Sequence, residues 1–127
     1  MLVVDTDVMV DLLRGYQPAL DWLQNLGDEP LLIPGFVVME LIEGCKNTRE
    51  VRAVRKSLAD YGIVWPSDST CNAALSVFTS HRPKHGLGII DSLIGQIAID
   101  LGLPLATFNK KHYECIPGLQ TLQPYTR

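Results

Sequence analysis

The chain has 127 residues, of which 46% are hydrophobic, and its formal net charge is −3. This length predicts a single domain over residues 1–127, and the hydrophobic content excludes a disordered chain. The acidic balance argues against nucleic-acid binding through overall charge, but metal ions or a local basic patch can still meet phosphates.

The cysteines and the N-terminal pattern indicate where the protein works. Cys45, Cys71 and Cys115 are odd in number and show no paired spacing, so we expect a reducing, cytoplasmic environment. The first apolar run lacks a preceding basic stretch and is followed at once by Asp5 and Asp7, unlike a signal peptide. No apolar run reaches 18 residues, so no membrane span is predicted.

The first half of the chain alternates buried-strand patterns with helical patterns. Asp7 is placed as an N-cap and Pro18 in a first helical turn, while Gly15, Gly44 and Gly62 each end a helix. The predicted order is a strand over 1–4, helices over 8–14 and 18–26, a strand over 31–33, and helices over 37–42 and 48–61.

The second half continues this alternation. The predicted order is a strand over 63–65, a helix from Ser67 or Asp68 to 79, a helix over 90–101, a strand over 104–107 and a weak strand over 119–122. Residues 81–88 are expected to form a loop because they contain Pro83 and two glycines. Alternating strands and helices predict an α/β fold with a mostly parallel sheet of four to five strands.

Four acidic or amide residues stand where apolar runs end: Asp5, Glu40, Asp91 and Asn109. Asp5 and Asn109 follow strands, and sites in parallel sheets form beyond the carboxyl ends of the strands. Carboxylates in such places are costly unless a cation meets them. A shared divalent ion is the simplest explanation, and oxygen ligands of this kind suit Mg²⁺ or Mn²⁺ and phosphodiester chemistry.

Each of these carboxylates also has a purely structural interpretation. Asp5 could be a cap or a loop charge, and Glu40 could form a buried ion pair with Arg14. Asp91 could simply favour a helix N-terminus through the helix dipole. His81 and His85 do not suggest zinc instead, because the proline between them should break a helix.

Four segments carry a family resemblance over nearly the full length. They are residues 2–15 (LVVDTDVMVDLLRG), 38–44 (VMELIEG), 91–98 (DSLIGQIA), and 105–113 (LATFNKKHY) followed by 116–119 (IPGL). Their order and approximate spacing resemble those of PIN-domain ribonucleases of the VapC toxin type.

The resemblance implies a three-layer α/β/α PIN-like fold and cleavage of RNA by a metal-activated water. It implies Mg²⁺ or Mn²⁺ held by Asp5 and Asp91, with Glu40 in the same pocket. It also implies a VapB-type antitoxin that occupies the active site, and a homodimer. Where many relatives carry a fourth acid, this chain has Asn109 and His112. We therefore expect three acidic ligands, an orienting role for Asn109 and a weaker second metal site.

Candidate substrate contacts are Arg82 and Lys84, in the predicted loop before Asp91, and Thr107 as a hydrogen-bond donor. A second basic group could follow an RNA backbone, with a solvated helix face as the alternative. Its members are Lys46, Arg49, Arg52, Arg55 and Lys56.

Two other functions remain open at this point. Asp5, Thr6 and Asp7 after a strand also resemble the nucleophile motif of aspartyl-phosphate phosphatases. Those enzymes need a further lysine and a later acidic pair, for which only Asp91 and Asp100 are available. The missing fourth acid allows a non-catalytic PIN-like module that binds RNA or a protein.

Overall fold

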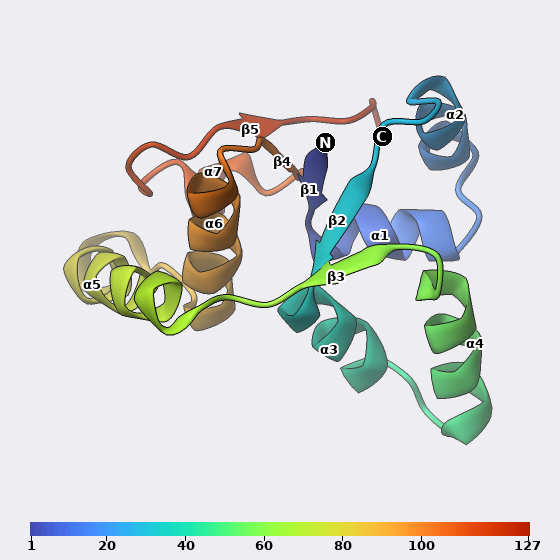
Figure 1. The fold of residues 1–127 in the computed structure, drawn as a ribbon, viewed down its shortest axis with the longest axis horizontal. Coiled ribbons are helices and arrows are strands. Elements are labelled where there is room, and N and C mark those ends of the chain that lie inside the picture. Colours follow the sequence, from blue (N-terminus) through green and yellow to red (C-terminus); the bar gives the residue numbers. More distant parts are fainter.

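The computed structural model describes residues 1–127 as seven helices and five strands (Figure 1). The strands are β1 (Leu2–Val4), β2 (Leu31–Pro34), β3 (Gly62–Val64), β4 (Leu105–Ala106) and β5 (Thr121–Leu122). The helices are α1 (Thr6–Leu13), α2 (Gln17–Asn25), α3 (Gly35–Glu43), α4 (Thr48–Leu58), α5 (Asp68–His85), α6 (Ile89–Leu101) and α7 (Lys110–Tyr113).

All five strands are parallel and form one sheet in the order β3-β2-β1-β4-β5. The central strand β1 pairs with β2 through Leu2 and Leu31 and with β4 through Val3 and Leu105. Parallel pairing brings the carboxyl ends of the strands to one edge of the sheet. Residues that follow β1, β2 and β4 therefore emerge side by side.

Helices cover both faces of this sheet, which confirms the expected three-layer α/β/α arrangement. Helix α1 contacts α2 and α3, and α3 contacts α4. Helix α5 packs on α6 at the other side of the molecule (Figure 1). Val3, Val4, Ile33 and Leu105 are fully buried between the layers. No helix is long and apolar enough to cross a membrane.

The N-cap of α1 lies two residues earlier in the chain than the sequence predicts. The helix begins at Thr6, and Asp5 is its N-cap, accepting a hydrogen bond from the Thr6 amide at 2.8 Å. The prediction that Asp7 is the cap is wrong. Asp7 instead lies in the first turn, where its carboxylate also favours the positive end of the helix dipole.

The predicted loop over residues 81–88 is also wrong in its first part, because α5 continues to His85 with Pro83 inside it. Proline fits helical φ and removes one bond to the carbonyl four residues earlier. That carbonyl belongs to Thr79, which is exposed, so water can replace the lost bond. The helix ends at Gly86, whose φ of +67° suits glycine.

The continued helix changes the expectation for the two histidines of α5. The rings of His81 and His85 lie 5.6 Å apart, one turn from each other, so Pro83 does not separate them. They remain a pair without a third ligand, because no group of three His, Cys, Asp or Glu side chains could hold a metal ion. The structure adds one short helix, α7, where the sequence predicts a turn, and ends α4 at Leu58 rather than 61.

Candidate active site

Asp5 is the most buried acidic side chain at the carboxyl edge of the sheet, with 4% of its surface exposed. One carboxylate oxygen accepts from the Thr6 amide, and the other accepts from the Thr107 hydroxyl at 2.7 Å. Burial, together with the nearby charge of Asp7, raises the pKa of Asp5 to about 6. The fold thus fixes a carboxylate in a place where its negative charge is costly.

Asp91 reaches the same region from the first turn of α6. The Tyr113 hydroxyl donates to Asp91 Oδ1 at 3.2 Å, and it lies close enough to Asp5 to oppose the rise in the pKa of that carboxyl. Burial between these two carboxylates holds the pKa of Tyr113 far above its usual range, so its hydroxyl stays protonated. Tyr113 therefore lies near both Asp5 and Asp91, and His112 adds a nitrogen 3.6 Å from Asp91 Oδ2.

Glu40 approaches from α3 and is exposed. The Thr6 hydroxyl donates to Glu40 Oε1 at 2.9 Å, which connects it to the residue beside Asp5. The alternative of a buried ion pair with Arg14 is not found: Glu40 is at the surface and forms no ion pair. The interpretation of Glu40 as a costly buried charge is accordingly wrong.

Asp7 holds the segment after β4 in place. Its carboxylate accepts from the Val8 amide at 2.8 Å and from the Phe108 amide at 2.9 Å. Burial raises the pKa of Asp7, although these hydrogen bonds oppose the shift. Asp7 is thus a structural bridge between α1 and the last motif, and its proximity contributes to the raised pKa of Asp5.

Asn109 lies at the start of α7 and is exposed, and its side chain forms no hydrogen bond with the site acids. Its backbone amide donates to the Thr107 hydroxyl at 3.0 Å. Thr107 is buried and already bonded to Asp5. The structure therefore places Thr107 within the carboxylate network and Asn109 at its border.

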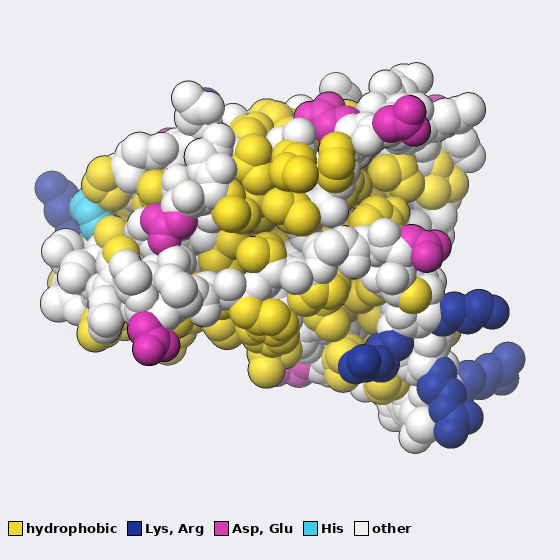
Figure 2. Space-filling view, viewed as in Figure 1, with side chains coloured by type: hydrophobic (Ala, Val, Ile, Leu, Met, Phe, Trp, Pro, Cys, Tyr) yellow, Lys and Arg dark blue, Asp and Glu magenta, His cyan; other side chains and the backbone are white.

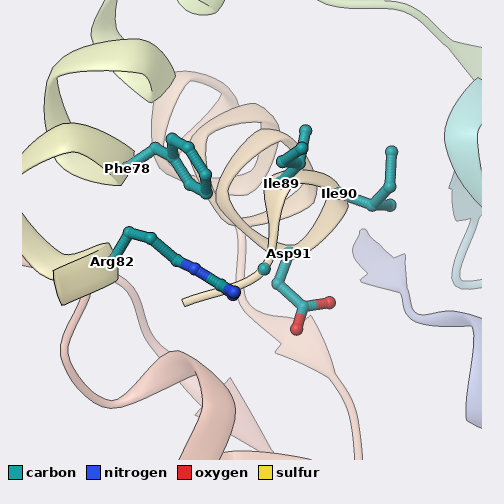
Figure 3. Close-up of a pocket in the computed structure, with 6 residues that line it drawn as sticks. Phe78, Arg82, Ile89, Ile90 and Asp91 are labelled. Carbon is teal, nitrogen blue, oxygen red and sulfur yellow. The ribbon is translucent and has the colours of Figure 1, made fainter. Parts of the chain in front are cut away.

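Arg82 and Asp91 line a cavity of about 410 Å³ between α5 and α6. Figure 3 shows the Arg82 guanidinium and the Asp91 carboxylate extending toward the same space, beside Phe78 and Ile89. Arg82 also donates to the carbonyls of Gly86 and Leu87, both at 3.2 Å. A cationic side chain is therefore held in position beside one of the site acids.

The second basic group lies on and just before α4, at one corner of the molecule (Figure 2). None of its side chains takes part in an ion pair, so their charges face solvent. A different side of α4 borders a groove of about 610 Å³ that begins at Thr6 and Glu40 and is lined further along by Val54 and Arg14.

The phosphatase alternative requires a later acidic partner near Asp5. Asp100 lies in the last turn of α6, nine residues after Asp91, which is about 14 Å along a helix. It accepts hydrogen bonds from Thr70 and Gln96 instead. The arrangement therefore does not provide the acidic pair that such phosphatases use, and no lysine forms an ion pair with Asp5.

Sequence reasoning missed Thr6 and Tyr113 as parts of the site. Tyr113 stands inside a quoted motif, and a signal was available: a tyrosine in an otherwise polar KKHY segment is buried only if its hydroxyl finds a partner. The link from Thr6 to Glu40 depends on the crossing of α1 and α3, which no local pattern encodes.

Comparisons with known proteins agree with this fold. The model of the PIN domain family matches residues 2–115. Ribonuclease VapC10 of Mycobacterium tuberculosis is 34% identical over 126 residues, covering 98% of this chain and 92% of that protein. A toxin–antitoxin complex from Klebsiella pneumoniae has a TM-score of 0.79 at 25% identity, with 98% of both chains covered. VapBC2 from Rickettsia felis, bound to a DNA fragment from its promoter, has a TM-score of 0.81 at 22% identity over 95% and 96% of the chains, which shows the fold.

Proposed function

This chain belongs to the PIN-domain family, with VapC ribonucleases as relatives, and from that premise we propose that it is a toxin endoribonuclease dependent on Mg²⁺ or Mn²⁺. One observation carries the proposal beyond the relatives: the Tyr113 hydroxyl donates to Asp91 and lies near Asp5, so both carboxylates meet at the edge where the parallel strands end.

The donor atoms present fit a hard divalent ion. Asp5, Asp91 and Glu40 offer only oxygen atoms, and no lysine or arginine forms an ion pair with any of them. No group of three acidic, histidine or cysteine side chains lies close enough together to hold an ion, so the proposal relies on two carboxylates, and Mg²⁺ usually binds through one or two carboxylates and keeps several waters. We assign Asp5 and Asp91 as ligands and Glu40 as an acid acting beside them.

When bound, such an ion supplies a Lewis acid that activates water and stabilises negative charge on the phosphodiester. The chain's own residues orient the reacting groups. Thr107 and the Thr6 amide fix the two oxygens of Asp5, and Tyr113 orients the carboxylate of Asp91. Thr6 holds Glu40, which lines the groove beside α4 rather than the cavity beside Asp91. With a pKa of about 6, Asp5 is mostly ionised at neutral pH.

We place RNA across the cavity between α5 and α6. Arg82 lies there beside Asp91, and the exposed Lys84 lies two residues further along α5. Both would contact phosphates, which gives affinity without base specificity. Thr107 contributes through Asp5 rather than by touching RNA, since its hydroxyl is buried.

The partner is a VapB-type antitoxin that covers the active site, and the toxin is proposed to be a homodimer. The groove that starts at Thr6 and Glu40 supports the antitoxin assignment. It combines apolar side chains such as Val54 with two cations, Arg14 and Lys46, and two acids, Glu40 and Glu50, and so suits a segment with apolar residues and charges of both signs.

The test is cleavage of a structured RNA by the purified protein. We expect cleavage with Mn²⁺ or Mg²⁺, none after EDTA, and at least a 100-fold loss in Asp5→Asn, since metal sites supply several kcal/mol of stabilisation. Asp28→Asn, an exposed acid elsewhere, should retain full activity. The antitoxin encoded beside the toxin gene should stop cleavage. Activity that survives both EDTA and Asp5→Asn would refute the proposal.

A non-catalytic module is the second candidate, and one observation favours it. The last motif provides the exposed amide of Asn109 and the imidazole of His112 in place of a fourth acid. In that case the protein binds the same RNA without cutting it. RNA binding in a filter assay, with no cleavage at any Mn²⁺ concentration up to millimolar, is the result that distinguishes this candidate.

A further inference from the structure

The segment after β5 turns back onto α1. The Tyr125 hydroxyl donates to Asp11 Oδ2 at 2.7 Å, and Arg127 Nε donates to the same oxygen at 3.0 Å. Arg127 Nη2 also donates to the backbone carbonyl of Asp7 at 3.3 Å. These contacts join residues separated by more than a hundred positions, so they depend on the completed fold.

The same two residues enclose the side chain of Phe108. The Arg127 guanidinium lies 4.2 Å from the centre of the Phe108 ring, a cation–π distance. The Tyr125 ring meets Phe108 edge-on, with centroids 4.9 Å apart. The backbone amide of Phe108 also donates to the Asp7 carboxylate at 2.9 Å. Phe108 is thus fixed through both its ring and its backbone.

Phe108 stands between two residues that contact the acidic site. Thr107 donates to Asp5 Oδ2 at 2.7 Å, and the Asn109 amide donates to Thr107 at 3.0 Å. Helix α7, which carries His112 and Tyr113 to Asp91, follows directly. A shift of Phe108 would therefore also move the side chains that contact the carboxylates of Asp5 and Asp91.

We propose that Asp11, Tyr125 and Arg127 form a latch that positions the residues between β4 and α7, and through them Asp5 and Asp91, for RNA cleavage. This inference rests on the proposed function. The latch residues touch neither carboxylate of the site, so they are positioning residues. Arg127 is 46% exposed, so its side chain can be removed without emptying the core, whereas its partner Asp11 is only 13% exposed.

Catalysis is sensitive to small displacements, since a misplacement of about 1 Å can cost 10²-fold in rate. We therefore expect Arg127→Ala to lower kcat about 10-fold, with KM for RNA changed less than 2-fold. Arg127→Lys should recover part of the loss, because lysine keeps the charge near Asp11 but cannot stack as a planar group on Phe108.

An exposed arginine could instead hold RNA directly, and Asp11→Asn separates the two roles. It removes the carboxylate of the latch while leaving every cation in place. Positioning predicts a similar kcat loss in Asp11→Asn and a smaller, 2- to 3-fold loss in Tyr125→Phe. Direct RNA binding by Arg127 predicts a raised KM in Arg127→Ala and no effect of Asp11→Asn, a result that would overturn the latch.

The experiment also separates the latch from the proposed function. The intact protein and Asp28→Asn are measured alongside, and their metal-dependent cleavage establishes the proposed function by itself. If they cleave RNA while Asp11→Asn and Tyr125→Phe both keep full kcat, the latch is refuted and the ribonuclease assignment stands. If the intact protein does not cleave RNA, the proposed function fails first. Should Arg127→Ala not fold, the other two variants decide.

Discussion

At the scale of single residues, the site is defined by one charge placed where solvation is poor. Asp5 is almost completely buried and is flanked by Asp7, and its only compensation within the chain comes from hydrogen bonds. A group with a folded-state pKa of about 6 and an unfolded value near 3.8 favours the folded state only while protonated. Its cost therefore grows as pH rises through this interval.

This cost predicts that Asp5→Asn stabilises the protein in the absence of metal. The shift from 3.8 to about 6 corresponds to roughly 3 kcal/mol at most, and altered hydrogen bonds should reduce the observed gain to about 1–2 kcal/mol at pH 7.5. At pH 4 the gain should largely vanish, because Asp5 is then protonated in the folded protein. Urea unfolding at the two pH values measures this difference.

In the presence of divalent metal, the intact protein should become more stable than Asp5→Asn. Millimolar Mn²⁺ is expected to raise the Tm of the intact protein and leave that of Asp5→Asn unchanged, since binding to the folded state stabilises it. Equal metal-induced shifts in both proteins would show that Mn²⁺ binds away from Asp5.

At the scale of elements, sequence patterns located strands and helices well but their ends less well. The strand end that carries Asp5 is predicted because the apolar run stops abruptly there, whereas β4 ends at Ala106 and Asn109 lies three residues later, as the N-cap of α7. The cap of α1 was misplaced because Asp5 and Asp7 are equally good capping residues, and only the fold decides between them. The sequence predicts that the helix stops before Pro83, but α5 continues to His85 because an exposed last turn tolerates the lost backbone hydrogen bond.

Helix α6 packs closely against the chain after α7. This contact keeps Asp91, on α6, close to Tyr113, on α7. A Cβ on Gly95 would lie 2.8 Å from the Ile116 side chain, which is itself buried, and 3.3 Å from Leu119. Glycine at this helix position therefore permits a contact that any larger side chain would obstruct.

We expect Gly95→Val to lower the free energy of unfolding by about 2–3 kcal/mol through overpacking. The matched change Gly44→Val should cost less than about 1 kcal/mol, because a Cβ there meets only ordinary contacts at 3.6 Å or more. Chemical denaturation compares the two variants. Similar losses in both would mean that a valine side chain at any glycine position, rather than the contact with Ile116, sets the cost.

At the scale of the whole molecule, the parallel sheet explains how residues from four distant motifs meet. The family motifs allowed Asp5, Glu40 and Asp91 to be named as a group, and the fold brings Asp5 and Asp91 to one tyrosine hydroxyl with Glu40 on the neighbouring threonine. The exposed state of Glu40 and the linking role of Tyr113 could not be predicted, because both depend on how helices cross.

The contacts of the latch could not be predicted from the sequence at all. Asp11 reads in sequence as one more acid on a helix, and Tyr125 as part of an irregular polar stretch. Their contact, at 2.7 Å across 114 positions, exists only once β5 has joined the sheet edge and the chain returns to α1. Contacts with so large a sequence separation leave no local periodicity to detect.

We propose that Asp5 and Asp91, with Glu40 beside them, hold a catalytic divalent ion. Anomalous diffraction at the manganese edge, from a crystal of this protein grown with Mn²⁺, tests it most directly. The expected result is a peak within about 2.0–2.3 Å of oxygens of both Asp5 and Asp91, near the usual range for small hard cations. A peak confined to other residues, or none beside Asp5 at millimolar Mn²⁺, would contradict the account.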